Sequence, residues 1–376
     1  MTHQKHPYKV LIAAGGTGGH IFPAIAIADA IKRQLPTCDI TFAGTRSHLE
    51  WTVVPKAGYP IKPIWISGFQ RKFTLANLLF PIKLIVSLIQ SMIIISKVNP
   101  NVVICCGGYV SGPIGRIAAL MGRPLMLQEQ NSYPGVTNRL LGKKSHTIFT
   151  AFSEAAKYFP IKKVKLFGNP IRSDILNGNR QAAASAYNFN PTRKTLLIMG
   201  GSGGAASLNQ AMLRNLEYLH NELHLQIIWQ CGKRYLGEMT MKVDQSKYPD
   251  LHLVSFLDSM PDVYALADLV VCRSGAGTIS ELLALGKPSI LVPSHNVAGN
   301  HQYHNAESVV NNGGAMLIED HQLEEQLAKS IASVISDPKK LLDMGQRALS
   351  MGHPDAANHI ALEILELTNP DFNSKS

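Results

Sequence analysis

Glycine-rich segments that follow short apolar runs contain the residues best placed to do chemistry. The first is GGTGG at 15–19, and the helix expected over 22–34 would direct its positive end at an anion bound there. It is neither a Walker loop, because no Gly-Lys-Ser/Thr follows, nor a dinucleotide fingerprint, because Ile21 stands in place of the third glycine. GGYVSG at 107–112 could wrap a phosphate or a sugar. For both segments a tight turn without a ligand stays an alternative.

A similar loop, GGSGGA at 200–205, begins 185 residues after the first and opens the second half of the chain. Gly201, Gly203 and Ala206 match G-x-G-x-x-A, so a dehydrogenase has to be considered. A dinucleotide site needs an acid at the end of the next strand to hold a ribose hydroxyl, whereas that run ends in Gln230 and Cys231. The sequence therefore disfavours a nicotinamide enzyme.

The segment RSGAGTISE at 273–281 combines small residues with the start of a helix, expected over 279–285. Open backbone N–H groups at a helix N-terminus suit a diphosphate, and Glu281 could accept hydrogen bonds from ribose hydroxyls. The competing interpretation is a capping box, in which Thr278 and Glu281 only satisfy the helix start. Because glycines and Ser274 surround this glutamate, we favour nucleotide binding.

His20 ends the first glycine-rich loop. A neutral imidazole there could take the proton from an attacking hydroxyl as a general base, and the alternative is a histidine that caps the helix or bonds a phosphate. No Asp-x-Asp sequence occurs, so the usual carboxylate clamp for a metal-bound diphosphate is missing and no metal site is predicted. Helix dipoles and Arg172 would instead neutralise a departing diphosphate.

Parallel sheets must hold these loops, because short β-branched runs alternate with longer helical patterns along the chain. The expected strands are residues 9–13, 40–43, 102–106, 125–128, 147–150 and 163–167, then 195–199, 225–230, 252–254, 269–272, 289–292 and 315–318. We predict an α/β fold of two Rossmann-like domains facing a cleft. The first comprises residues 1–170, with 353–376 packing back on it, and the second comprises residues 171–352. Ligands in such sheets bind at the carboxyl ends of the strands.

Charge is divided unevenly along the chain. Residues 1–168 contain 20 lysines and arginines against five acids, the remainder carries 16 basic and 21 acidic residues, and residues 51–128 contain no acid. Such a field attracts a polyanion, and nucleic acid is disfavoured because RNA-stacking motifs and a helix-turn-helix are missing. Five cysteines without zinc-ligand spacing and a polar N-terminus without a secretory signal indicate reduced thiols in a cytoplasm.

An apolar segment at 76–95 is nearly long enough to span a bilayer, but Pro81 and Lys83 lie inside it. We predict a helix over 81–97 that packs on the sheet, preceded by an exposed patch at 64–80 that mixes aromatic with basic side chains. Such a patch lies in an anionic membrane interface. The alternative is that the apolar residues are core and the lysines are solvated.

Taken in order, GGTGGH, GGYVSG, QEQNSYPGVTNR, GNPIR, GGSGGA, FLDSM, RSGAGTISE and HQYHNA resemble the bacterial MurG family throughout the chain. Its members are UDP-N-acetylglucosamine:undecaprenyl-pyrophosphoryl-muramyl-pentapeptide N-acetylglucosamine transferases with a GT-B fold. The resemblance implies inverting transfer of N-acetylglucosamine to the muramyl 4-hydroxyl of an undecaprenyl-linked acceptor (lipid I to lipid II) in peptidoglycan synthesis, and hence a part in cell shape and division.

The resemblance further implies a basic N-terminal domain that binds the acceptor and a C-terminal domain that binds UDP-N-acetylglucosamine. The enzyme would be peripheral, on an anionic membrane surface at the cytoplasmic face of the bacterial inner membrane. No cofactor is expected to be required, although a divalent cation and other cell-wall synthesis proteins as partners stay open.

Roles for individual residues also follow from the resemblance alone. Catalysis is implied for His20 and Glu129. Donor binding is implied for Thr17, Gly18, Gly19, Asn131, Arg172, Ser202, Leu257, Ala276, Gly277, Thr278, Ile279, Ser280, Glu281, His301 and Gln302. Acceptor binding is implied for Gly15, Gly16, Gly108, Tyr109 and Ser111. Three positions depart from the family pattern: Gln128 replaces a histidine, Gly203 a common glutamine and Gly277 a frequent leucine.

Two other functions stay open. An epimerase acting on UDP-N-acetylglucosamine would share the fold without a lipid acceptor, and the acid-free, apolar N-terminal stretch argues against it. A membrane-bound scaffold would bind nucleotide sugar without chemistry. The substitution Glu281→Ala separates these, because an enzyme would lose turnover and a scaffold has none to lose.

Overall fold

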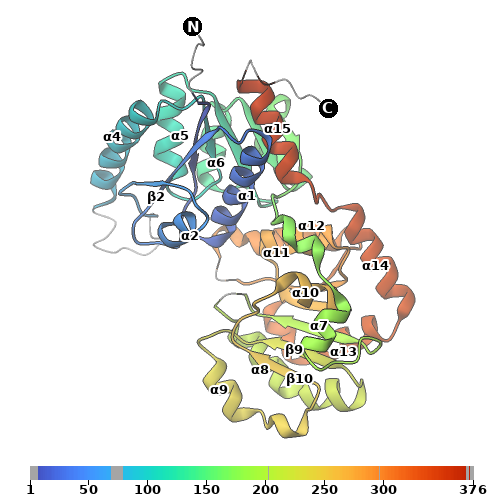
Figure 1. Ribbon diagram of the computed structural model, residues 1–376. Helices are drawn as coiled ribbons and strands as arrows, with labels where there is room; N and C mark the ends of the chain where they lie inside the picture. The colour runs from blue at the N-terminus through green and yellow to red at the C-terminus, as the bar shows by residue number, and fades with distance from the viewer. Residues whose placement is uncertain (1–6, 69–78, 202, 296, 370–371, 373–376) are drawn as a thin grey trace. The chain divides into compact units, whose positions relative to one another are not determined.

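The computed structural model describes residues 7–68, 79–201, 203–295, 297–369 and 372. The chain forms two compact units, Met1–Arg172 with Asp355–Ser376 (unit 1) and Ser173–Pro354 (unit 2) (Figure 1). The division falls two residues from the boundary expected near residue 170.

Unit 1 is built on a seven-stranded sheet with the order β3-β2-β1-β4-β5-β6-β7, in which every pair is parallel. Its strands are β1 Lys9–Ala13, β2 Asp39–Gly44, β3 Ile61–Pro63, β4 Val102–Cys105, β5 Leu125–Glu129, β6 Thr147–Thr150 and β7 Val164–Leu166. Its helices are α1 Gly18–Gln34, α2 Glu50–Lys56, α4 Phe80–Val98, α5 Ser111–Leu120, α6 Val136–Gly142 and α15 Ala356–Thr368.

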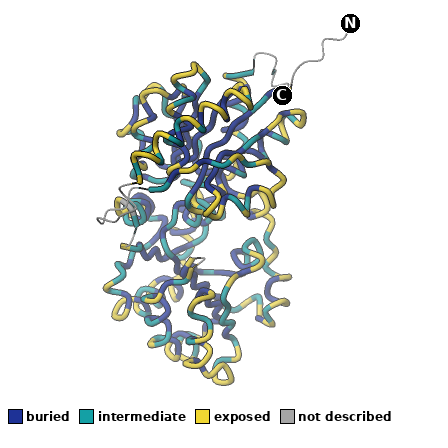
Figure 2. Tube along the Cα trace, turned by 90° about the vertical axis from the view of Figure 1, so that its left-hand side faces the viewer, coloured by how far each residue is buried: buried dark blue, intermediate teal, exposed yellow. Residues whose placement is uncertain are grey.

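The central strands β1 and β4 of unit 1 are continuously apolar over residues 10–13 and Val102–Cys105, because helices cover both faces of the sheet. Along β1, Val10 and Ile12 enter the core under α1 and α15, whereas Leu11 and Ala13 enter the core under α4, α5 and α6. This alternation is the two-residue period of a strand. Figure 2 shows the resulting buried strands beneath more exposed helices.

Helix α15 packs against α1, so a helix that follows unit 2 in the sequence belongs to unit 1 (Figure 1). Ile360, Ile364 and Leu365 on α15 are fully buried in the same core as Ile27 of α1.

Unit 2 repeats this design with a six-stranded parallel sheet in the order β10-β9-β8-β11-β12-β13. Its strands are β8 Thr195–Met199, β9 Gln226–Gln230, β10 Leu251–Val254, β11 Leu269–Arg273, β12 Ser289–Val292 and β13 Met316–Leu317. Its helices are α7 Arg180–Ala186, α8 Ala206–Glu217, α9 Leu236–Lys242, α10 Met260–Leu266, α11 Ala276–Ala284, α12 His301–Val310, α13 Leu323–Ile335 and α14 Pro338–Ser350.

The strand order reverses at one point in each sheet, between β1 and β4 in unit 1 and between β8 and β11 in unit 2. Open α/β sheets bind ligands at the carboxyl ends of the strands at such a switch point. The loops that end β1, β4, β8 and β11 are the glycine-rich and small-residue segments on which the sequence analysis focused. The fold therefore brings them together in pairs, one pair in each unit.

Two expected helix starts were wrong and one strand was missed. Strand β3 was not predicted, helix α1 begins at Gly18 rather than residue 22, and α11 begins at Ala276 rather than residue 279. The last difference removes the capping box, because Gly275 is the N-cap of α11 and Thr278 lies inside the helix. The predicted helix over 81–97 is α4, which packs against α5 and touches β1.

Candidate active site

The two glycine-rich loops of unit 1 are in direct contact at the switch point between β1 and β4. A Cβ on Gly108 would lie 2.1 Å from the carbonyl oxygen of Gly15, and a Cβ on Gly107 would lie 2.6 Å from Cδ2 of His20. Gly107 and Gly108 also have left-handed φ angles of 97° and 78°, which glycine adopts readily. These glycines are therefore required for the two loops and the His20 ring to pack together.

His20 lies in the first turn of α1 and is partly exposed. Its Nδ1 is 3.1 Å from the hydroxyl of Thr17. When that hydroxyl accepts from Nδ1–H, the basic lone pair of the imidazole is on Nε2, as a general base requires. The structure thus gives His20 a fixed position beside both predicted acceptor-binding loops.

Glu50 is a buried residue of this site that the sequence analysis missed. Its carboxylate accepts hydrogen bonds from the backbone N–H of Gly16 at 3.2 Å and from the N–H and hydroxyl of Thr45 at 3.0 and 2.6 Å. A Cβ on Gly15 would lie 2.8 Å from its Oε1. Glu50 therefore positions the first glycine-rich loop. One signal was available, since it is the only acid between Asp39 and Glu129.

The two predicted acceptor residues that follow Gly108 differ in their surroundings. Ser111 is fully buried, and its Oγ lies 2.8 Å from the Gly107 carbonyl, 3.0 Å from the Ala13 carbonyl and 3.0 Å from the Gly107 nitrogen, which donates to it. This hydroxyl therefore links the loop after β4 to the end of strand β1. Tyr109 is 49% exposed, which leaves its side chain accessible to a ligand.

Glu129 at the end of β5 is buried and surrounded by donors. Its carboxylate accepts from the backbone and side-chain nitrogens of Asn131 (3.0 and 3.3 Å), the backbone of Gly135 (3.1 Å) and the side chain of Asn138 (2.9 Å). Burial raises the pKa of Glu129 above its ordinary value, and these donors oppose the shift. The contacts favour a positioning role, in which Glu129 orders the segment that carries Asn131.

In unit 2 the N-terminus of α11 lies at the switch point between β8 and β11. The small residues Gly275, Ala276 and Gly277 form its first turn, and none makes a side-chain cap. The preceding Ser274 is fully buried, and its hydroxyl has no hydrogen-bond partner in the part of the chain that the structure describes. A helix N-terminus with an unsatisfied hydroxyl beside it suits a phosphate group.

Glu281 lies further along α11 and is partly buried. The hydroxyl of Tyr264, itself fully buried on α10, donates to Glu281 Oε2 at 3.0 Å. This bond fixes the carboxylate that was predicted to hold the ribose.

Hydrogen bonds join the loop after β8 to the end of β9, where a dinucleotide-binding site would hold a ribose. The side-chain amide of Gln230 donates to the carbonyl of Gly201 at 3.0 Å and accepts from the backbone N–H of Gly200 at 3.1 Å. The position where a dinucleotide site requires an acid is therefore occupied by a structural glutamine. The predicted Ser202 of this loop lies outside the described residues.

The remaining predicted donor residues are spread over both units. Thr17, Gly18, Gly19, Asn131 and the exposed Arg172 belong to unit 1. In unit 2, Leu257 is buried after β10, Thr278, Ile279 and Ser280 are on α11, and His301 and Gln302 open α12. Gln302 Oε1 accepts from the backbone N–H of Ser294 at 2.9 Å, which ties α12 to the loop after β12.

Known protein families match both units of the chain. Residues 10–150 match the glycosyltransferase family 28 N-terminal domain and residues 195–360 match the family 28 C-terminal domain. A UDP-N-acetylglucosamine–N-acetylmuramyl-(pentapeptide) pyrophosphoryl-undecaprenol N-acetylglucosamine transferase of Flavobacterium psychrophilum is 42% identical over 96% of this chain and 98% of its own.

Solved structures agree with the fold. The crystal structure of MurG from Acinetobacter baumannii is 26% identical with a TM-score of 0.77, covering 96% of this chain and 100% of that one. A UDP-GlcNAc 2-epimerase from Neisseria meningitidis (15% identical, TM-score 0.68, covering 95% of this chain and 100% of its own) shares the fold alone. The predicted GT-B architecture of two parallel-sheet α/β domains is confirmed.

Proposed function

This chain belongs to the MurG family of glycosyltransferase family 28, and we propose that it transfers N-acetylglucosamine from UDP-N-acetylglucosamine to the muramyl 4-hydroxyl of undecaprenyl-pyrophosphoryl-MurNAc-pentapeptide, with inversion at the anomeric carbon. The observation that carries the proposal is the α11 N-terminus. The buried Ser274 hydroxyl that precedes this uncapped helix has no partner among the described residues, and Tyr264 fixes Glu281 further along the helix. These groups match the diphosphate and ribose of a nucleotide donor.

We propose that unit 2 binds the donor and that its leaving group departs without a cofactor. The N-terminal N–H groups of α11 stabilise the negative charge that develops on the diphosphate as the bond to the sugar breaks. Arg172 contributes a second positive charge. Glu281 accepts from the ribose hydroxyls, and Gln302 reaches the sugar.

Unit 1 binds the acceptor in this proposal. Nε2 of His20 takes the proton of the muramyl hydroxyl while its oxygen attacks the anomeric carbon and UDP leaves from the opposite face. The histidine is held for this by Thr17 and by contact with Gly107. Glu129 acts indirectly, since its hydrogen bonds order the segment around Asn131 rather than presenting a free carboxylate.

We further propose that α4 holds unit 1 on the cytoplasmic surface of the inner membrane. Of the helices in the described residues, α4 is the one long and apolar enough to cross a bilayer, and only 17% of its apolar window is buried. Its inner face carries Ser87 and Ser91, which are buried and bonded to the helix's own carbonyls. Its outward face carries the exposed residues Ile82, Ile85, Ile89, Met92 and Ile93.

A buried polar face and an exposed apolar face support a helix that lies on the membrane. Because the serine face packs against α5, α4 cannot be surrounded by lipid while unit 1 is folded. Lys62 and Lys97 line a groove of about 360 Å³ beside α4, where they could pair with anionic headgroups. Trp65 is exposed next to Lys83, whereas Ile64 and Ile66 of the predicted patch are buried. Phe69, Arg71, Lys72 and Phe73 of that patch lie outside the described residues.

The direct test is transfer of radiolabelled sugar from UDP-N-acetylglucosamine to a purified lipid-linked muramyl-pentapeptide, with UDP release followed in parallel. Equal transfer and release is the expected result. UDP release without transfer would indicate an epimerase or hydrolase, and no release would indicate a binding protein.

Two variants assign the roles. His20→Ala should lower turnover by about two to four orders of magnitude while UDP binding survives. Glu281→Ala should instead weaken UDP binding. If His20→Ala weakens UDP binding and leaves turnover at saturating donor intact, His20 is a binding residue and not the base.

A further inference from the structure

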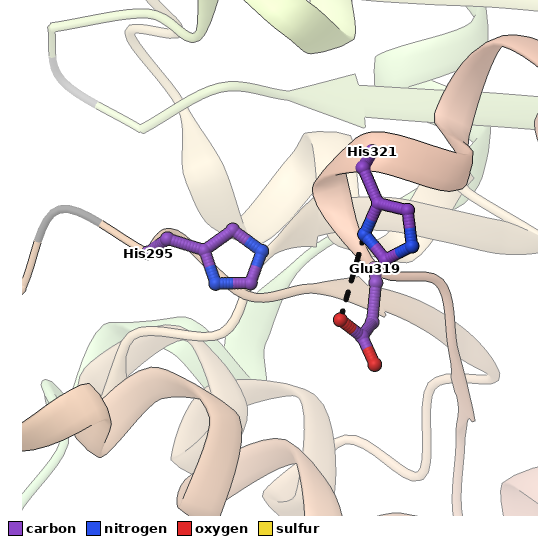
Figure 3. Close-up of side chains that lie close together, drawn as sticks. All are labelled: His295, Glu319 and His321. Atoms are coloured by element: carbon purple, nitrogen blue, oxygen red, sulfur yellow. Dashed lines mark ion pairs between the residues drawn. The ribbon is translucent and has the colours of Figure 1, made fainter.

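Unit 2 contains a cluster of metal-ligating side chains that the proposed transfer reaction does not use. His295, in the loop after β12, and Glu319 and His321, just after β13, point toward one another (Figure 3). Their ligand atoms all lie within 4.8 Å of one another. Strands β12 and β13 are parallel neighbours, so their carboxyl ends bring the two loops to the same edge of the sheet.

We propose that these three side chains bind a divalent transition-metal ion of the Zn²⁺, Co²⁺ or Ni²⁺ class. Two imidazoles and one carboxylate form a donor set that such ions prefer, and water completes the coordination. Ligands on one ion at about 2.1 Å lie about 3 to 4 Å apart, so only small side-chain rotations are needed. Both histidines are exposed, which leaves their rings room to rotate.

The backbone that carries the ligands is already held in place. The guanidinium of Arg273 donates to the carbonyls of Val292 and Pro293, just before His295, and forms an ion pair with Asp320, which lies between Glu319 and His321. Ser207 also accepts from Arg273 at 2.8 Å and donates to Asp320 at 2.8 Å. One partly buried arginine therefore joins the two ligand loops, so metal binding needs little reordering of the chain.

An ordinary ion pair is the competing explanation, since His321 Nδ1 lies 3.6 Å from Glu319 Oε2. The chain offers a comparison on α12, where His304 Nδ1 lies 3.6 Å from Glu307 Oε2 and both side chains are also partly exposed. Within the described residues only the first pair has a third ligand, His295, in reach. A metal site and a mere ion pair thus predict different behaviour for the two pairs.

The test uses the full chain without a histidine tag, treated with a chelator and then titrated with Co²⁺ alone, with visible absorption as the readout. We expect one saturable Co²⁺ per chain. His295→Ala and His321→Ala should each weaken it about tenfold or more, because even outer partners of metal ligands contribute about 10- to 100-fold. Glu319→Gln should act in the same direction, and His304→Ala should leave the titration unchanged.

Two outcomes would overturn the proposal: no saturable Co²⁺ absorption, or equal binding by wild type and His295→Ala. Because the substituted histidines are exposed, the variants should retain the wild-type melting temperature, which confirms that they are folded. The titration needs no donor, so its result is independent of the proposed transferase function.

One consequence rests on the proposed function. The backbone of Ser294, adjacent to His295, donates to Gln302, so a metal ion on His295 restrains a residue proposed to contact the sugar. Co²⁺ should therefore tighten UDP-N-acetylglucosamine binding about fivefold in the wild type and not in His295→Ala. Because the coupling is reciprocal, the donor should tighten Co²⁺ binding by the same factor. Co²⁺ binding without this change would retain the metal site and reject the coupling. Absence of any donor binding would instead reject the proposed function.

Discussion

The double substitution Ile85→Ser with Ile89→Ser should detach the protein from membranes without unfolding it. The two side chains are 60% and 49% exposed, and they lie four residues apart on the outward face of α4. Neither fills the core, so their removal leaves no cavity. The buried residues on the opposite face, including Ser87 and Ile95, keep α4 attached to unit 1.

The expected magnitude follows from the exposed fractions. Complete burial of an isoleucine side chain stabilises by about 1.5 to 3 kcal/mol, and each of these two has about half of its surface left to bury in lipid. Each substitution should therefore remove about 0.8 to 1.5 kcal/mol of membrane binding. Together they should lower the partition coefficient by about 10- to 150-fold.

Sedimentation with vesicles that contain phosphatidylglycerol measures this partition coefficient. The matched control is Leu342→Ser with Leu349→Ser on α14, because these leucines are 60% and 54% exposed in the other unit. The control variant should bind as the wild type does. Unchanged binding of the α4 variant, or an equal loss in the control, would refute the assignment of α4 as the membrane-binding face.

Three further predictions concern the two sites and the stability of unit 2. Gly107→Ala should lower turnover about 100-fold by displacing His20, a typical effect of moving a catalytic group by about 1 Å, while binding of UDP survives. Gly122→Ala is its control, since Gly122 also has a left-handed φ but no atom within 4 Å of the added Cβ; equal losses of turnover would attribute the effect to backbone strain. Tyr264→Phe should weaken UDP binding about tenfold in calorimetry, because the Glu281 carboxylate predicted to bind the ribose loses the hydrogen bond that fixes it. Unchanged affinity would show that Glu281 does not bind the ribose. Burial lowers the pKa of Lys287 to about 8 from 10.5, so the unfolded chain binds more protons between these values and the wild type gains stability as pH rises through them. Urea unfolding gives the free energy of unfolding of the wild type and of Lys287→Met at pH 7 and at pH 10.5. The wild type should gain up to about 3 kcal/mol relative to Lys287→Met between these pH values, and a difference independent of pH would contradict the prediction.

Most of the fold could be predicted because a strand buried on both faces is a continuous apolar run. The expected strands at 9–13, 147–150, 195–199 and 289–292 coincide with β1, β6, β8 and β12. Strand β3 could not be found in this way, since Ile61–Pro63 has three residues, one of them a lysine and one a proline. The start of α11 was misplaced because a glycine N-cap has no side chain to signal it.

The candidate site was predictable at the level of loops and much less so at the level of side chains. Ser111 and Glu129 have functional groups that a substrate could use, but the fold binds both to the backbone of neighbouring loops. Glu50 reaches Gly16 from 34 residues away, and no spacing rule connects them. The same holds for His295 and His321, which only the pairing of β12 with β13 brings together.

The return of α15 to unit 1 has a consequence for synthesis on the ribosome. Unit 1 is discontinuous in sequence, with all of unit 2 inserted between Arg172 and Asp355. The nascent chain therefore contains every residue of unit 2 before it contains the helix that covers α1. A stop codon just after residue 354 would leave unit 2 complete, whereas the core of unit 1 would lose Ile360 and Ile364 and expose apolar surface to cellular proteases. Unit 1 therefore cannot complete its core until the residues of α15 have been synthesised, after all of unit 2.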